Sequence, residues 1–439
     1  MNDRVLKPGF AFLFFLLLLL NNHAGAQNLT GGGEANPQLL TNQKSLLKWQ
    51  ELRYGMFIHW GPVSLQGTEI GWSRGREVPF DEYDQLYKEF NPEKFDAREW
   101  VSLIKKSGMK YLIMVSKHHD GFVMWDSRTT DYDIMSTPYG KDVLENLSKE
   151  CKKQGILFGT YYSICDWRHP DYPVEHNRTG QKKNAGMERY IAYMKAQLKE
   201  LVEKYQTRIL WFDGEWEDPW THEMGMDLYR YVRSLDDEIL INNRVDKGRR
   251  GMEGLSESNR FAGDFATPEQ QVGRFDTLTP WESCITICTQ WAWKPEDVLK
   301  TKEECIQTLL KTVGGDGNLL LNIGPKPDGT IESRQKDRLL EIGEWLFQYG
   351  ETIYGNRGGP IPPQQWGVTT EKKGKVYVHL LENESQIRIQ NFPYEVLSAQ
   401  LFEKQRKIEY KLENKELFLL IQEMPDKPID TIVELTVEK

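Results

Sequence analysis

Residues 208–216, Arg-Ile-Leu-Trp-Phe-Asp-Gly-Glu-Trp, predict a buried β-strand that ends in a carboxylate. The apolar run 209–212 is typical of a strand that is covered on both faces. Side chains alternate along a strand, so Trp211 and Asp213 share one face, and Gly214 lets the backbone turn directly after the acid. An aromatic wall beside an acid at a strand's end suits the floor of a glycosidase site. Asp213 could equally cap the next helix, so the choice between a helix cap and a catalytic acid depends on the rest of the sequence.

Strand-like and helix-like segments alternate on both sides of this stretch. Besides the central strand, strands are expected at 54–61, 110–116, 156–163, 238–243, 264–266, 281–289 and 317–325. Helical patterns cover 96–107, 141–154, 187–205, 224–235, 297–313 and 332–349. Repeated βα units predict a parallel sheet, and eight strands match a closed (β/α)8-like TIM barrel. The alternative is an open doubly wound sheet, but no Gly-rich nucleotide-binding turn follows the first strand.

The pattern changes after Pro360-Ile361-Pro362-Pro363. Apolar and polar residues alternate with a period of two in the segments 375–381, 385–391, 397–403, 407–410, 416–422 and 431–437. We therefore expect a catalytic barrel over 27–355 and a small C-terminal antiparallel β-sandwich over 361–439. The second domain has few candidate catalytic groups, so we interpret it as a lid or a buttress.

The first 26 residues are typical of a secretory signal peptide. A basic start is followed by an apolar run at 10–20 and by Ala24-Gly25-Ala26, a small-residue cleavage site. The apolar run is too short to span a bilayer, and no other segment resembles a membrane span. The expected location is secreted or periplasmic, or lysosomal in a eukaryote.

The composition argues against nucleic acid as a partner. The net charge is -9, and no Lys/Arg cluster is present. The five cysteines are irregularly spaced, so they predict neither a disulfide framework nor a zinc site.

Unusual polar residues follow the predicted strands, where a barrel enzyme builds its active site. They are His59, His118, His119, Tyr161, Tyr162, Asp213, Arg244 and Glu269. Adjacent residues on a strand point in opposite directions, so His118 and His119 are not expected to hold one metal ion. The sequence contains no GxSxG elbow, so a serine hydrolase of that type is not expected.

Paired carboxylates remain as the chemistry that fits these residues. Glycoside hydrolysis needs one acid as nucleophile or base and a second acid that protonates the leaving group. Asp213 is the first of the pair. Spacing alone does not choose the second among Glu215, Glu217, Glu269 and Glu282.

Four motifs resemble the α-L-fucosidases of the retaining glycoside hydrolase family 29. They are YGMFIHWGP at 54–62, KHHDGF at 117–122, WFDG at 211–214 and GDGNLLLNIGP at 315–325. The resemblance covers roughly residues 45–355. It implies a (β/α)8-like barrel, a C-terminal β-sandwich, and double displacement through a covalent intermediate without a metal or another cofactor.

The resemblance also implies roles for individual residues. Asp213 matches the nucleophile, and Glu269 is our choice for the acid/base, with Glu282 second. The positions that match the sugar pocket are His59, His118, His119, Tyr161, Trp211 and Arg244. Arg244 could keep Asp213 ionised while a less solvated Glu stays protonated.

The loop after the first strand departs from the family pattern. Family members commonly carry an adjacent Glu-Trp pair there, whereas this chain has Thr68-Glu69-Ile70-Gly71-Trp72. Glu69 and Trp72 are expected to bind the sugar with shifted spacing. The apolar C6 methyl of fucose needs an aromatic slot, which Trp211, Trp72 or Phe57 could form.

These features predict an exo-acting retaining α-L-fucosidase that acts on fucosylated oligosaccharides or glycoconjugates. One alternative keeps the mechanism but changes the sugar to galactose or a sulfated fucose. Another is a non-catalytic glycan-binding barrel. The linkage preference and the oligomeric state do not follow from the sequence.

Overall fold

The computed structural model describes residues 30–178, 182–422 and 429–438. The predicted signal peptide, residues 1–26, lies outside the described residues. No helix within the described ranges has the length and apolar character that crossing a membrane would require.

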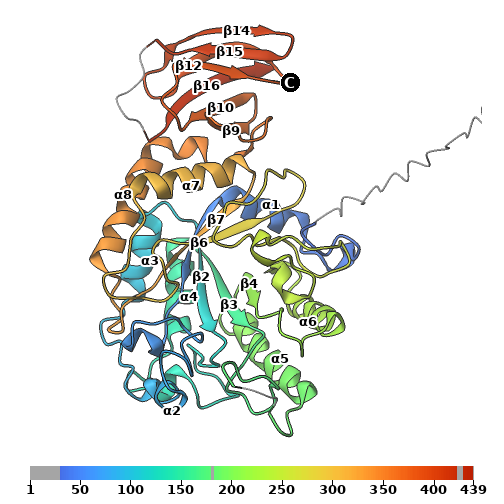
Figure 1. Cartoon of the computed structure of the whole chain (residues 1–439), viewed down its shortest axis with the longest axis vertical. Coiled ribbons are helices and arrows are strands. Elements are labelled where there is room, and N and C mark those ends of the chain that lie inside the picture. The colour runs from blue at the N-terminus through green and yellow to red at the C-terminus, as the bar shows by residue number, and fades with distance from the viewer. Residues whose placement is uncertain (1–29, 179–181, 423–428, 439) are drawn as a thin grey trace, which may run out of the picture.

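Seven parallel strands form the sheet of the larger part of the molecule, in the order β5-β4-β3-β2-β1-β7-β6 (Figure 1). In chain order they are β1 (Tyr54–Ile58), β2 (Tyr111–Lys117), β3 (Leu157–Ser163), β4 (Ile209–Asp213), β5 (Leu240–Ile241), β6 (Glu282–Thr286) and β7 (Asn318–Ile323).

The expected strand at 264–266 is present only as isolated parallel bridges. Phe265 pairs with Asn242 at the end of β5, and Ala266 pairs with Trp281 at the start of β6. These bridges connect the two edges of the seven-stranded sheet and close the ring. Pro268 lacks an N–H group, which limits the hydrogen bonding of this segment and explains why it does not extend into a full strand.

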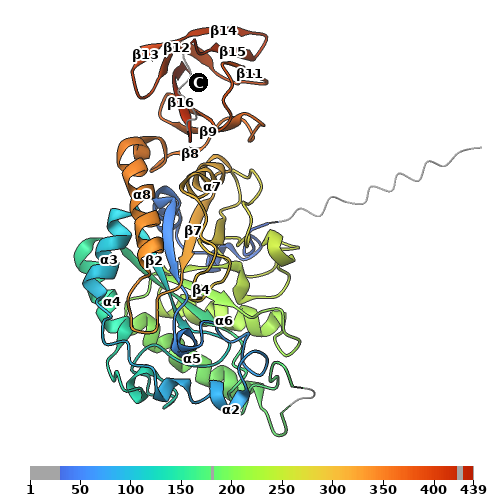
Figure 2. The same cartoon turned by 60° about the vertical axis from the view of Figure 1, so that its left-hand side comes forward.

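Helices cover the outside of the strands (Figure 2). Those after β1 to β4 are α3 (Ala97–Lys106), α4 (Val143–Gln154), α5 (Met187–Glu203) and α6 (His222–Leu235), and those flanking β7 are α7 (Lys302–Gly314) and α8 (Ser333–Tyr349). The shorter helices α1 (Gln43–Leu52) and α2 (Phe80–Tyr83) lie before β1 and in the loop after it. Helix α7 begins five residues later than predicted, because Thr301 and Glu304 form a capping box at its start.

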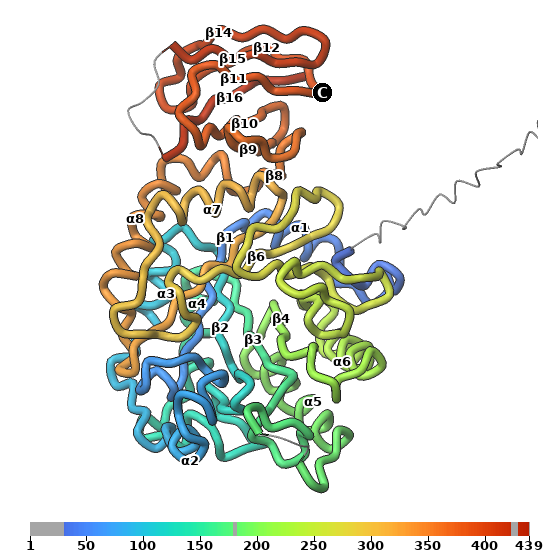
Figure 3. The backbone as a smooth tube through the Cα atoms, in the orientation of Figure 1, coloured from blue at the N-terminus to red at the C-terminus, as the bar shows by residue number. Residues whose placement is uncertain are grey.

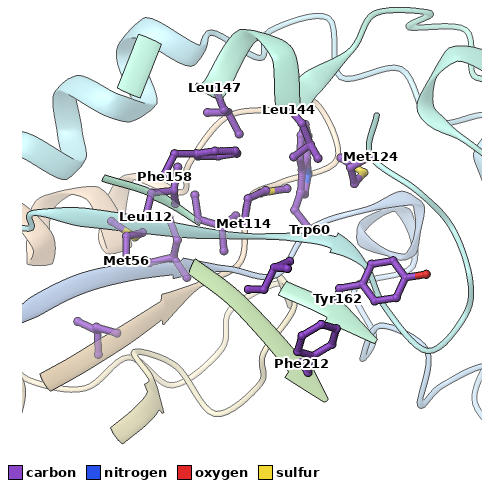
Figure 4. Packing of buried hydrophobic residues seen from close by; sticks show 14 of the residues in the cluster. Met56, Trp60, Leu112, Met114, Met124, Leu144, Leu147, Phe158, Tyr162 and Phe212 are labelled. Atoms are coloured by element: carbon purple, nitrogen blue, oxygen red, sulfur yellow. The ribbon is translucent and has the colours of Figure 1, made fainter. Parts of the chain in front are cut away.

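Alternation along the strands divides the core into two layers. Met56, Leu112, Phe158 and Phe212 point outward toward the helices, where Leu144 and Leu147 of α4 lie (Figure 4). The alternate residues, among them Phe57, Ile113, Tyr161 and Trp211, fill the inside of the barrel. Trp211 therefore faces inward, as the sequence predicted.

The C-terminal part consists of two antiparallel sheets, with the orders β13-β12-β16-β10-β9-β8 and β11-β15-β14. Their strands are β8 (Arg357–Gly358), β9 (Gly367–Lys372), β10 (Lys375–Leu380), β11 (Gln386–Ile389), β12 (Glu395–Leu401), β13 (Arg406–Lys407), β14 (Glu409–Glu413), β15 (Glu416–Leu420) and β16 (Thr431–Glu438). The sequence pattern missed β8 and β9. The predicted fold class, a (β/α)8-like barrel followed by a β-sandwich, is confirmed.

The C-terminal sheets lie on the side of α7 and α8 (Figure 3). The long loops that follow β1 and β3 lie at the other end of the molecule in the same view. The C-terminal part therefore does not cover the loops that follow β1 and β3, so it does not form a lid over them.

Candidate active site

A hollow opens where the barrel strands end. Its walls come from β1, β3, β4 and β6 and from the loops that follow the strands, and its lining residues are Phe57, His59, Trp72, His118, Tyr161, Trp211, Asp213, Trp216, Arg244, Glu269, Cys284 and Trp291. Of the site residues expected from the sequence, all line this hollow except Glu69, His119 and Tyr162, whose hydroxyl donates to Gln197 of α5. Among the residues that the structure describes, a larger hollow lies on the sheet β11-β15-β14, but its titratable side chains are exposed.

Asp213 is the last residue of β4 and is only 9% exposed. Its two carboxylate oxygens have different partners. Arg244 Nη1 donates to Oδ1 at 2.7 Å, and the Tyr161 hydroxyl donates to Oδ2 at 3.0 Å. Its carboxylate is therefore held by side chains that come from two neighbouring parts of the barrel.

Arg244 determines the charge state of this acid. Burial alone would raise the pKa of Asp213, but the positive charge of Arg244, with contributions from His119 and Arg249, lowers it below the ordinary value. The Arg244 guanidinium is almost fully buried and lies 4.5 Å from the ring centroid of Trp211. Asp213 therefore stays ionised in weakly acidic solution, as a nucleophile requires.

Glu269 is the second carboxylate in the hollow. Arg244 Nη2 donates to Glu269 Oε2 at 2.8 Å, so a single guanidinium contacts both acids. The backbone N–H of Glu269 donates to the Met252 carbonyl at 2.9 Å, and the side chain is 19% exposed. Glu269 thus contacts the buried Arg244, which also holds Asp213, and at the same time remains accessible to solvent.

Glu282, the second choice for the acid/base, lies elsewhere. It is the first residue of β6, is fully buried, and does not line the hollow. It accepts hydrogen bonds from Trp211 Nε1 at 3.0 Å and from the Tyr111 hydroxyl. Burial raises the pKa of Glu282 to about 7, although these two hydrogen bonds act in the opposite direction. The carboxyl lies beneath the pocket floor, where it holds the Trp211 indole.

His59 and His118 line the same hollow as Asp213, and His119 lies beside the Asp213 carboxylate. His59 Nδ1 is 2.6 Å from Asn322 Oδ1, and His119 Nδ1 is 2.6 Å from Ser163 Oγ. His119 Nε2 lies 3.7 Å from Asp213 Oδ2. Burial lowers the pKa of both His59 and His119 to about 4, so the imidazoles are neutral in weakly acidic solution and can exchange hydrogen bonds with hydroxyls.

Strand geometry predicted that His118 and His119 point in opposite directions, and this prediction is wrong. Strand β2 ends at Lys117, so the alternation no longer applies to them. Their ring centroids lie 4.1 Å apart. Within the ranges that the structure describes, no three His, Cys, Asp or Glu side chains group as metal ligands would.

Glu69 was expected to bind the sugar, but its carboxylate is occupied by backbone groups. It accepts from the N–H of Trp291 at 2.8 Å and from that of Ala292 at 3.2 Å. Burial raises the pKa of Glu69 to about 7. Glu69 therefore fixes the turn that carries Trp291, whose ring lies 4.9 Å from that of His59.

Trp72 lines the hollow, and Gly71 explains its position. Gly71 has a φ of +71°, and a Cβ at this residue would lie 2.9 Å from His118 Nδ1. Its N–H donates to the Tyr83 hydroxyl, which donates to Asp120 Oδ2, both at 2.7 Å. The loop after β1 is thus connected to the turn after β2.

Sequence reasoning missed Trp216, Trp291 and Cys284 as lining residues. Trp216 and Trp291 belong to loops at the catalytic end of the barrel, where aromatic residues are a weak but usable signal. Cys284 gave no such signal, because its inward direction depends on the register of β6. All five cysteines are buried free thiols.

Comparisons with known proteins agree on one family. The family model described as alpha-L-fucosidase matches residues 25–351. An alpha-L-fucosidase of Dictyostelium discoideum is 29% identical over 405 residues, which cover 84% of each chain.

Solved structures show the same similarity. Isoenzyme 1 of the alpha-L-fucosidase from Paenibacillus thiaminolyticus has a TM-score of 0.79 at 32% identity, covering 90% of this chain and 99% of that one. A Bacteroides thetaiotaomicron alpha-L-fucosidase, trapped as a covalent intermediate with 2-fluoro-fucosyl fluoride in a Glu-to-Gln mutant, has a TM-score of 0.82 at 27% identity. That match covers 91% of this chain and 97% of the other.

Proposed function

The chain belongs to the α-L-fucosidase family of glycoside hydrolases, and we propose that it cleaves terminal α-L-fucose with Asp213 as nucleophile and Glu269 as acid/base. As a member of this family it is a retaining glycoside hydrolase that works by double displacement. The observation that carries the residue assignment is the contact of Arg244 with both carboxylates at the hollow.

In the first step, an Asp213 oxygen forms a bond to the anomeric carbon as the bond from that carbon to the leaving oxygen breaks. The leaving oxygen takes the proton of Glu269 and departs as an alcohol. Negative charge thereby moves from Asp213 to Glu269. Arg244 contacts both groups, so its positive charge remains paired throughout the step.

In the second step, Glu269 takes a proton from water, and the water oxygen bonds to the anomeric carbon. The bond to Asp213 breaks, which restores its carboxylate. The products are fucose and the alcohol, and the two inversions give net retention.

The remaining residues recognise the sugar. His59 and His118 are buried at 4% exposure each, and their neutral rings can donate to or accept from the hydroxyls of fucose. Phe57 and Trp211, with ring centroids 5.1 Å apart, offer an apolar wall for the C6 methyl. His119, Tyr161 and Arg244 position Asp213. We assign Glu69 to the support of Trp291 rather than to the sugar itself.

Fucosylated oligosaccharides or glycoconjugates are the expected substrates. A galactose-like sugar is not favoured, because the relatives described above are all named α-L-fucosidases. A non-catalytic barrel is not favoured either, because both proposed catalytic carboxylates are present.

We further propose that residues 1–26 are a cleaved signal peptide, that 27–355 form the catalytic domain, and that 361–439 form the C-terminal domain. The basic start, the apolar run and the Ala24-Gly25-Ala26 site support export of the protein. The change from parallel to antiparallel strands after β7 supports the domain boundary.

Trapping tests the nucleophile assignment. Incubation with 2-deoxy-2-fluoro-fucosyl fluoride, followed by proteolysis and mass spectrometry, is expected to place the label on Asp213. A label on Glu215 or another acid would refute the assignment. The Asp213→Gly variant should lose about 10³-fold or more in kcat and yield fucosyl azide when azide is added, while its circular dichroism stays that of the parent protein.

A further inference from the structure

Two buried polar side chains lie directly behind histidines of the site and have no part in the mechanism described above. Ser163 is the last residue of β3, in register with Asp213 on β4, and Asn322 belongs to β7. Ser163 Oγ lies 2.6 Å from His119 Nδ1. Asn322 Oδ1 lies 2.6 Å from His59 Nδ1. Each of these two contacts needs a hydrogen, and its position defines the tautomer of the imidazole.

The only hydrogen of the Ser163 hydroxyl is used elsewhere. Ser163 Oγ donates to the backbone carbonyl of Cys165 at 2.7 Å, and a carbonyl can only accept. The hydrogen between Ser163 and His119 therefore belongs to His119 Nδ1. A neutral imidazole carries a single N–H, so His119 Nε2 has no hydrogen.

The amide of Asn322 leads to the same result for His59. Asn322 Nδ2 donates to the Trp291 carbonyl at 2.8 Å. This contact fixes the orientation of the amide, because the reverse orientation would place two carbonyl oxygens against each other. Asn322 Oδ1 is therefore the acceptor for His59 Nδ1–H, and His59 Nε2 has no hydrogen.

The His119 tautomer affects the nucleophile directly. His119 Nε2 lies 3.7 Å from Asp213 Oδ2, and it has no hydrogen-bond partner among the residues that the structure describes. An N–H at this position would stabilise the charge of Asp213, and that stabilisation is lost when Asp213 bonds to the sugar. With the hydrogen on Nδ1, on the side of Ser163, the ring leaves the carboxylate reactive.

We propose that two positioning residues fix the tautomers of these histidines. Ser163 fixes His119 as the Nδ1–H form, which keeps an N–H away from the nucleophile. Asn322 fixes His59 as the Nδ1–H form, so His59 accepts a hydrogen bond from the sugar and does not donate one. The inference rests on the proposed function for the role of Asp213, whereas the tautomers themselves do not depend on it.

NMR spectroscopy measures the tautomers without any substrate. In protein labelled with ¹⁵N-histidine, long-range ¹H–¹⁵N correlation spectra at neutral pH distinguish Nδ1–H from Nε2–H rings, and the chain has only 8 histidines. The signals are assigned by their loss in His59→Gln and His119→Gln. Both residues should be Nδ1–H tautomers, and an Nε2–H signal for either would refute the inference for that residue. Asn322→Leu removes the acceptor, so His59 should lose its Nδ1–H preference, and an unchanged His59 signal would refute the role of Asn322.

Ser163→Ala tests the consequence for catalysis. The variant removes the acceptor of His119 Nδ1–H, so His119 should change to the Nε2–H form and donate to Asp213. The kcat/KM for α-L-fucosyl fluoride should then fall about tenfold. Ser163→Thr keeps a hydroxyl and should retain the Nδ1–H signal and most of kcat/KM. Ser234→Ala is the matched control, because Ser234 Oγ also donates to a backbone carbonyl, at 2.6 Å, but on the exposed side of α6. It should change neither the His119 signal nor kcat/KM.

The outcomes separate the inference from the proposed function. If His119 stays Nδ1–H in Ser163→Ala, or changes tautomer while kcat/KM stays the same, the role of Ser163 is refuted. Lack of fluoride turnover by the unmodified protein would instead refute the proposed function and leave the spectra unaffected. Circular dichroism shows whether each variant is folded. If Ser163→Ala is not folded, the spectrum of the unmodified protein still decides whether His119 is the Nδ1–H tautomer.

Discussion

Arg244 is the residue on which the charge of the nucleophile depends. The pKa of Asp213 lies below its ordinary value because the charge and hydrogen bond of Arg244, together with His119 and Arg249, outweigh the effect of burial. In Arg244→Met that charge is gone, so burial is less strongly opposed and the pKa of Asp213 should rise. Asp213 would then become protonated at a higher pH, and the acidic limb of kcat/KM should move upward. The measurement is kcat/KM against pH with fucosyl fluoride.

Arg244→Lys is the matched control for this shift. It keeps the positive charge, so the acidic limb should stay close to that of the parent protein. An ammonium does not have the planar fork that reaches two carboxylates, so kcat should still fall. An unchanged acidic limb in Arg244→Met would contradict the role given to Arg244.

If Glu269 is the acid/base, variants of Glu269 and Glu282 should differ in how strongly the loss of kcat depends on the leaving group. Glu269→Ala removes the proton donor, so disaccharides should slow by about 10²- to 10⁴-fold, while fucosyl fluoride, which needs little protonation, slows far less. Glu282→Gln perturbs only the support of Trp211, so both substrates should slow by a similar factor. The measurement is kcat for both substrates with both variants. A selective loss on disaccharides in Glu282→Gln would transfer the acid/base role to Glu282.

At the scale of elements, the loop after β1 and the turn after β6 act as one unit through Glu69. Glu69→Gln keeps the size but leaves one acceptor oxygen for two backbone N–H groups. The variant should lose about 1–3 kcal/mol of stability, and kcat/KM should fall as Trp291 loosens. Thermal unfolding and fucosyl fluoride kinetics measure the two effects.

The pH dependence of stability gives a second measurement on Glu69. Its pKa is raised by burial from the ordinary 4.5 to about 7. Between these values the folded protein binds more protons than the unfolded chain, so this group's contribution to stability declines as the pH rises from about 4.5 to about 7. Glu69→Gln has no such group, so its stability should vary less across this window. An identical slope would contradict burial as the cause.

Strands and helices with a regular apolar pattern could be predicted from the sequence. Side-chain positions that depend on individual hydrogen bonds to distant loops could not. The inward direction of Trp211 and Asp213 follows from strand alternation, and the ends of β2 to β4 follow from their apolar runs, whereas β1 ends at Ile58, three residues before the end of the expected strand. The occupation of Glu69 by backbone N–H groups depends on a loop more than 200 residues away in the chain. The loop that carries Trp216 likewise depends on single contacts, because Arg249 donates to Glu215 and Trp167 donates to Glu217. The late start of α7 was visible as Thr301-x-x-Glu304, a pattern that outweighs apolar periodicity at a helix end.

At the scale of the whole molecule, Asp316 joins the barrel to the C-terminal sheets. Its Oδ1 accepts from Arg53 Nη2 at 2.6 Å and from the Gly358 N–H at 2.8 Å. Arg53 directly precedes β1, Asp316 precedes β7, and Gly358 belongs to β8, a strand of the C-terminal part. Arg357 Nε donates to the same carboxylate at 2.9 Å. The junction lies at the start of the barrel strands, whereas the hollow lies at their ends.

Asp316→Ala is therefore predicted to affect stability far more than catalysis. Arg53 is fully buried, and burial already lowers its pKa, so removing its partner leaves an uncompensated charge at a cost of about 3–5 kcal/mol. Urea unfolding followed by tryptophan fluorescence and by circular dichroism should show a lower midpoint. The two signals should separate if the C-terminal sheets unfold independently once the junction is lost.

Glu145→Gln, which breaks an exposed pair with Lys149 on α4, should change stability by less than about 1 kcal/mol. If Asp316→Ala unfolds at the same urea concentration as this control, the junction does not hold the two parts together.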